Sequence, residues 1–157
     1  MTQPALETQP ALETRWLASL QGTIPQPAVV TETLMVFNVL DAQLEGPRIN
    51  ASLRNPSGDW VRIVENGNWM LDVRMLLETD DGVPIYMRYN GVLRMDPGLN
   101  ERLASGEEIP GSEIYFRSSP YFETSSEKYS WLNDILAVGK IRSFGGGNVV
   151  YDVFEIL

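Results

Sequence analysis

Residues Trp69 to Gly91 decide the fold, and they read Trp-Met-Leu-Asp-Val-Arg-Met-Leu-Leu-Glu-Thr, then Asp-Asp-Gly, then Val-Pro-Ile-Tyr-Met-Arg-Tyr-Asn-Gly. Two strand-like runs flank an Asp-Gly pair, which is a strong short-range signal of a β-hairpin. Because side chains alternate between faces along a strand, each run has an apolar face and a polar face. The polar faces carry Asp72, Arg74, Tyr86 and Arg88. Such side chains also pair well when half-buried, so we interpret the hairpin as one barrel wall whose polar face lines a pocket.

Strand-like runs separated by turn signals continue on both sides of this hairpin. Asn55–Asp59 is predicted to be a tight turn, and a capping-box pattern at Thr124 predicts a helix over Ser125–Ala137. No alternation of strand and helix is present, which excludes a doubly wound fold. The pattern predicts a mainly all-β fold: a closed, calycin-like antiparallel β-barrel of about eight strands with one helix in the C-terminal half. The long connection 96–112 is expected to be either a functional lid or a surface insertion.

The N-terminus contains the hexapeptide Gln-Pro-Ala-Leu-Glu-Thr twice in tandem, at 3–8 and 9–14. Two copies of six residues are too short for a solenoid. We therefore predict a flexible tail over residues 1–28 and a single β-barrel domain over 29–157. A second interpretation is a short helix or arm that docks on a partner subunit through Leu6, Leu12, Trp16, Leu17 and Leu20.

Composition excludes several classes of chemistry. The 157 residues include no Cys and no His, so thiolate and histidine catalysis and the commonest metal ligands are absent. The net charge of −9 argues against nucleic acid and anionic membranes as partners. No apolar run is long enough to span a membrane as a helix, and no signal peptide is visible. A cytoplasmic location is the expectation.

Many short motifs, in order, resemble the DUF3237 (UPF0311) family. They include Glu45–Arg48, Ser57-Gly58-Asp59-Trp60, Leu71–Arg74, Thr79–Gly82 with Ile85-Tyr86, Tyr115–Arg117 with Pro120 and Phe122–Thr124, Tyr129, Trp131–Asn133 and Val150–Val153. Members tend to have two glycines before the Asp-Trp pair, where this chain has Ser57-Gly58. The resemblance spans roughly Leu44 to the C-terminus. It implies a closed small-molecule-binding β-barrel and carries no catalytic signature.

Asp72 is the sharpest candidate for chemistry, because Asp is disfavoured in the middle of an apolar strand. A buried carboxylate must be paired or have its pKa raised. We predict that Asp72 is a general acid or base and that Tyr86 or Arg117 stabilises an oxyanion. The alternative is a fixed ion pair of Asp72 with one of the arginines, or an outer wall that carries them. The predicted ligand-binding residues are Arg74, Arg88, Tyr115, Trp60, Trp69, Trp131, Tyr151 and Asp152.

These residues suggest a cofactor-independent acid/base enzyme, of isomerase, cyclase or lyase type, acting on a small apolar or aromatic compound. The alternatives are a non-catalytic carrier or sensor barrel, and an oligomeric structural protein with a solid core. No cofactor and no metal site are predicted, because the Asp80-Asp81-Gly82 turn is too small a match to a calcium loop. The expected partner is a small-molecule ligand or substrate, and exposed apolar strands are compatible with a homo-oligomer. A carboxylate open to a cavity with a raised pKa would favour the enzyme.

Overall fold

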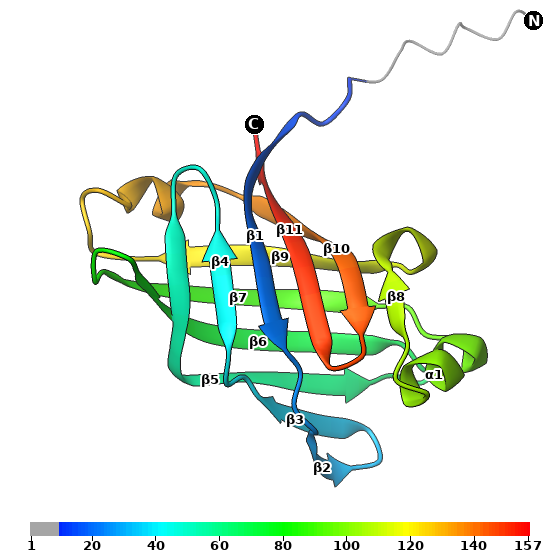
Figure 1. Ribbon diagram of the computed structural model, residues 1–157. Helices are drawn as coiled ribbons and strands as arrows, with labels where there is room; N and C mark the ends of the chain where they lie inside the picture. The colour runs from blue at the N-terminus through cyan, green and yellow to red at the C-terminus, as the bar shows by residue number, and fades with distance from the viewer. Residues whose placement is uncertain (1–9) are drawn as a thin grey trace, which may run out of the picture.

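In the computed structural model, which describes residues 10–157, eight antiparallel strands close into a barrel (Figure 1). Around the barrel the order is β5, β4, β1, β11, β10, β9, β7 and β6, and pairing of β6 with β5 completes the closure. The strands are β1 (Thr14–Thr23), β4 (Ala42–Glu45), β5 (Asn50–Ile63), β6 (Trp69–Thr79), β7 (Pro84–Leu93), β9 (Phe116–Glu123), β10 (Ala137–Gly145) and β11 (Asn148–Ile156). The predicted fold class is confirmed, and so is the central hairpin, in which Asp72 pairs with Asn90.

Shorter elements lie at the two ends of the barrel. The hairpin of β2 (Ala28–Thr31) and β3 (Leu34–Asn38) extends the sheet beyond β5, and β8 (Glu108–Pro110) pairs with β10. One α-helix, α1 (Pro97–Ala104), and two 3-10 helices, η1 (Gly111–Glu113) and η2 (Ser130–Asp134), complete the described residues. None of the helices in residues 10–157 has the length and apolar character needed to cross a membrane.

The helix predicted over Ser125–Ala137 is wrong, because side-chain contacts fold this segment differently. Thr124 and Asn133 pair reciprocally, with the Thr124 amide donating to Asn133 Oδ1 and Asn133 Nδ2 donating to the Thr124 carbonyl, each over 2.9 Å. Lys128 Nζ and Tyr129 Oη both donate to Asp81 over 2.7 Å, which ties the segment to the β6–β7 turn. Hydrogen bonds made by three side chains, Asn133, Lys128 and Tyr129, thus replace those of a continuous α-helix.

The predicted tail is also wrong where it includes β1, while residues 1–9 lie outside the described residues. Thr14–Thr23 pairs with β11 along its whole length and with β4 over Ser19–Gly22. Leu17 and Leu20 are buried in the barrel, with 0% and 3% of their surface exposed. The hydrophobic effect therefore holds this segment inside the domain. The prediction of a free tail was based on the tandem repeat and did not take this burial into account.

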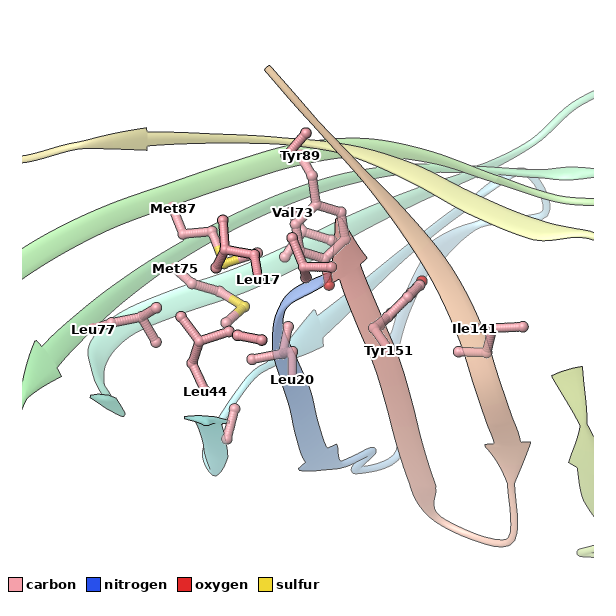
Figure 2. Close-up of a cluster of buried hydrophobic side chains, with 14 of the residues drawn as sticks. Leu17, Leu20, Leu44, Val73, Met75, Leu77, Met87, Tyr89, Ile141 and Tyr151 are labelled. Carbon is pink, nitrogen blue, oxygen red and sulfur yellow. The ribbon is translucent and has the colours of Figure 1, made fainter. Parts of the chain in front are cut away.

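The interior has a filled half and, toward one end, a hollow half, and Figure 2 draws some of the buried side chains. Large aliphatic side chains with at most 1% exposure pack the filled half, and they are Leu17, Leu44, Leu77, Ile85 and Met87. None of them borders the cavity described below. The hollow half lies toward the end of the barrel that carries the β10–β11 turn and α1 (Figure 1).

A bulge in β5 replaces the tight turn that was predicted at Asn55–Asp59. From the Arg54–Leu76 pair to the Gly58–Arg74 pair, β5 advances four residues (58 − 54) and β6 two (76 − 74). The Ser57 hydroxyl bridges the gap, because it accepts from the Leu76 amide over 3.0 Å and donates to the Arg54 carbonyl over 2.7 Å. Since the surplus of residues is even, the alternation of faces keeps its phase across the bulge. Asp59 therefore points inward.

We predict that Ser57→Ala lowers the free energy of unfolding by about 1 kcal/mol, because the half-buried Leu76 amide loses its acceptor. Ser52→Ala, on the same strand, is the matched control, since its hydroxyl contacts only the exposed Gln43 side chain. Urea unfolding of both variants measures the difference. Equal losses in the two variants would mean that the Ser57 hydroxyl does not hold the bulge.

Candidate functional site

A cavity of about 320 Å³ occupies the hollow half of the barrel. This volume is at the lower end of the range for small-molecule sites. The wall is mostly apolar, and its aromatic residues are Phe37, Trp69, Tyr89, Phe116, Phe144 and Tyr151. The mouth is formed by Gly22–Pro27, which includes the end of β1, and by Gly145–Gly147 at the β10–β11 turn. This is the concave, largely apolar kind of site that encloses a small ligand.

Asp59 is the inner of two carboxylates that line the cavity, and the other, Asp41, is exposed. Asp59 lies in a lateral row with Phe37 on β3, Val73 on β6 and Tyr89 on β7, which the strand register places side by side. Its Oδ1 atom is buried and has no hydrogen-bond partner among the described residues. Burial, assisted by the negative charge of Asp72, raises the pKa of the Asp59 carboxyl to about 7, although a backbone hydrogen bond from Asp72 opposes part of the shift. The group can therefore both take up and release a proton near neutral pH.

Two buried tyrosines face the same cavity. Tyr89 is 8% exposed and Tyr151 is 3% exposed, and their ring centroids lie 5.9 Å apart in an edge-to-face arrangement (Figure 2). Phe116 stacks on Tyr151 at 5.1 Å, which fixes the plane of the Tyr151 ring. Burial and the nearby Asp59 charge raise the pKa of both phenols, so both remain protonated at neutral pH. Tyr151 Oη is buried and has no hydrogen-bond partner in the structure of residues 10–157.

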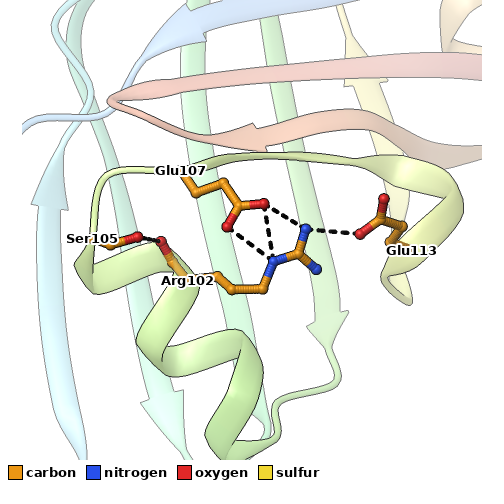
Figure 3. Close-up of polar contacts among 4 residues, drawn as sticks. All are labelled: Arg102, Ser105, Glu107 and Glu113. Carbon is orange, nitrogen blue, oxygen red and sulfur yellow. Dashed lines mark hydrogen bonds and ion pairs between the residues drawn. The ribbon is translucent and has the colours of Figure 1, made fainter.

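The connection between β7 and β9 contributes to the rim of the cavity. Leu103, in the last turn of α1, lines the cavity. Its neighbour Arg102 holds the segment together, because the guanidinium contacts Glu107 at 2.6 Å and Glu113 at 2.8 Å (Figure 3). The segment that the sequence predicts to be either a lid or a surface insertion is therefore folded, and it borders the cavity.

The polar face of the central hairpin lies on the outside of the barrel, so its predicted position in a pocket is wrong. The side chains of Asp72 and Arg74 are 47% and 57% exposed, and their closest charged atoms are 3.5 Å apart. Arg88 is exposed and Tyr86 half-buried on the same outer face. The apolar residues that alternate with them are buried. The apolar face enters the barrel because its burial releases far more free energy than the pairing of one acid with one arginine.

Other predicted polar residues also lie on the outer wall. Arg117 and the 40% exposed Tyr115 border a surface recess, where the Arg117 guanidinium lies 4.8 Å from the Tyr115 ring centroid. Asp152 accepts hydrogen bonds from Ser19 over 2.8 Å and from Arg142, so its carboxylate is already occupied. Asp152 thus links β11 to β1 and β10, and none of the three residues lines the cavity.

The predicted aromatic residues divide between the two sides of the wall. Trp69 and Tyr151 line the cavity. Trp60 is 42% exposed on the outer face, and Trp131 packs beneath the Arg48 guanidinium, whose central carbon lies 3.9 Å from the ring centroid. Two of the eleven predicted site residues therefore belong to the cavity, and the carboxylate that it contains was missed.

Asp59 was missed because Asn-Pro-Ser-Gly-Asp is the composition of a turn. A signal was nevertheless present in the motif Ser57-Gly58-Asp59-Trp60, which carries part of the family resemblance. Gly58 is tightly placed, since a Cβ atom there would lie 3.0 Å from the Trp60 ring. Among residues 10–157, no three carboxylates gather closely enough to share a metal ion.

These features define a closed eight-stranded β-barrel with an internal cavity of ligand size. The chain belongs to the DUF3237 family, described as a protein of unknown function, whose sequence profile matches residues 4–156. A UPF0311 protein of Rhodopseudomonas palustris is 28% identical over 152 residues, covering 94% of this chain and 99% of the relative. A UPF0311 protein of Clostridium acetobutylicum is 29% identical over 120 residues, covering 73% of this chain and 75% of the relative.

Solved structures share the fold. The crystal structure of a conserved protein of unknown function from Rhodopseudomonas palustris has a TM-score of 0.88 and 28% identity, covering 96% of this chain and 100% of that one. A β-barrel-like protein from Acinetobacter baumannii has a TM-score of 0.74 and 27% identity, covering 96% and 99%. An enzyme from Penicillium herquei has a TM-score of 0.66 and 18% identity, covering 97% and 100%. That last likeness is one of fold.

We predict that Asp59 makes stability fall as pH rises. Between the unfolded value of 3.8 and the folded value of about 7, the folded chain keeps the Asp59 proton while the unfolded chain loses it. From about pH 4 to about pH 8, the unfolding free energy of Asp59→Asn should therefore rise by about 4 kcal/mol relative to wild type. Urea unfolding across this range measures it. Asp80→Asn, in the exposed β6–β7 turn, should show no such change, and a flat difference for Asp59→Asn would contradict the raised pKa.

Proposed function

We propose that this protein is a cofactor-independent acid/base enzyme that moves a proton within a small, apolar, carbonyl-containing compound. The observation that carries the proposal is that two residues lining the cavity, Asp59 and Tyr151, each have a buried polar atom with no hydrogen-bond partner among the described residues, Oδ1 and Oη. Native proteins leave few buried polar groups unpaired, and a catalytic role is one explanation for such a group. A carboxylate with a pKa near 7 and a protonated phenol on the wall of one cavity are suited to proton transfer.

The chemistry uses both groups in turn. The Asp59 carboxylate removes a proton from the carbon next to the carbonyl group of the substrate. The electrons of that C–H bond form the enol double bond, and the carbonyl π electrons move onto the oxygen. Tyr151 donates a hydrogen bond to this oxygen and stabilises its negative charge. Asp59 then returns the proton to a carbon of the same molecule, which completes an isomerisation with no change in oxidation state.

The cavity wall supports this assignment in a second way. Its apolar and aromatic residues exclude water, which strengthens the interaction of both polar groups with a bound molecule. The Asp59 carboxylate has no arginine partner to lock it, in contrast to Asp152 on the outer wall. A carrier would need neither an ionisable group with a pKa near 7 nor an unlocked carboxylate. The isomerase interpretation is therefore preferred to the carrier or sensor interpretation.

The test follows hydrogen–deuterium exchange of beta-tetralone, a neutral aromatic ketone, in deuterium oxide by NMR. We expect the wild type to accelerate exchange next to the carbonyl group, and Asp59→Asn to lower the catalysed rate by about a hundredfold or more. Asp80→Asn serves as the matched control and should retain the rate.

Two outcomes would contradict the proposal. If beta-tetralone binds to the wild type without accelerated exchange, the carrier interpretation replaces it. If Asp72→Asn abolishes exchange while Asp59→Asn retains it, the reacting carboxylate is the one on the outer face.

A further inference from the structure

The charges around the cavity are of one sign. Among the described residues that line it, two are carboxylates, Asp59 within and the exposed Asp41 at the mouth, and none is a lysine or arginine. All cations that form ion pairs in residues 10–157 do so elsewhere in the structure. An anionic ligand would lose its hydration and gain no opposite charge, which is strongly unfavourable in an apolar cavity.

An organic cation fits the cavity less well than a neutral molecule. An ammonium group carries three N–H donors, all of which need partners once they are desolvated. Among the described residues, the fully buried side-chain atoms of the wall that lack a hydrogen-bond partner are Asp59 Oδ1 and Tyr151 Oη. One hydroxyl group matches these two atoms, because its hydrogen donates to the carboxylate while its oxygen accepts from the phenol.

The rest of the wall specifies the body of the ligand. Phe116 is stacked between Phe144 and Tyr151, with ring centroids 5.2 Å and 5.1 Å away. These rings and Trp69 line the cavity with apolar aromatic surface. Planar apolar molecules cover such surfaces well, since aromatic faces stack with an offset.

We propose that the cavity selects uncharged, largely apolar, planar molecules in which a single hydroxyl or enol oxygen bridges Asp59 and Tyr151, and that it excludes carboxylates and ammonium compounds of the same shape. This inference names the substrate class of the proposed proton-transfer site and rests on that function. An enol is the form that the substrate of such a reaction takes when its carbonyl oxygen carries the proton. The site is thus complementary to the enol more than to the ketone.

Calorimetric titration at neutral pH tests the selectivity with three probes of one shape: beta-naphthol, beta-naphthoate and beta-naphthylmethylammonium. We expect beta-naphthol to bind at least about tenfold more tightly than either ion, because each ion is buried without full compensation. Equal or tighter binding of either ion would overturn the proposal. Failure of all three probes to bind would overturn it as well.

Tyr151→Phe then locates the hydroxyl group of the ligand. Because no protein group among residues 10–157 forms a hydrogen bond with Tyr151 Oη, its removal should cost little stability, which urea unfolding verifies. The variant should bind beta-naphthol about fivefold to tenfold more weakly while binding naphthalene, which lacks the hydroxyl, as the wild type does. Equal effects on the two ligands would overturn the bridging geometry.

The two proposals can fail separately. Selective binding of beta-naphthol without exchange of beta-tetralone supports the ligand class and contradicts catalysis. Exchange of beta-tetralone together with tight binding of beta-naphthoate supports catalysis and contradicts the ligand class.

Discussion

The alternation of faces in a closed sheet is the constraint on which this structure depends. Once β5 pairs with β6, each side chain of either strand points into the barrel or out of it. The bulge at Ser57 adds an even number of residues to β5, so the phase is the same on both sides of it. Leu53 and Asp59 consequently share the inner face, one at the filled half and the other at the hollow half. A surplus of one residue would place the carboxylate in water and Trp60 in the barrel.

Asp59 lowers the stability of the folded chain. A carboxylate whose oxygen is buried without a partner destabilises the folded chain when it is ionised. Two other carboxylates show the contrast: Asp81 accepts hydrogen bonds from Lys128, Tyr129 and Thr79, and Glu155 from Arg15 and Arg48. The contrast separates carboxylates that hold strands together from the one that is kept available. Proteins tolerate such local conflicts mainly at functional sites.

The sequence was informative about the fold and misleading about the site. Hairpin turns and alternating apolar residues identified the central hairpin and the antiparallel barrel, because these signals are local and physical. To locate the site, one must know which face of each strand enters the barrel. The functional interpretation was assigned to the polar face that contains Asp72, whereas the apolar face lines the interior. Asp59 lay hidden in a turn-like pentapeptide, since a bulge and a turn use the same residue types. Only its place in a family motif distinguished it.

The division of the interior into a filled and a hollow half has a consequence for how this fold diversifies. The aliphatic layer around Leu17 and Leu77 supplies cohesion without bordering the cavity. Substitutions among the cavity-lining residues therefore leave that layer intact, so the lining can vary while the barrel is retained. The fold itself is retained in solved structures that are 28% and 27% identical to this chain. The packed layer and the cavity lining are made of different residues, so a change in one need not disturb the other.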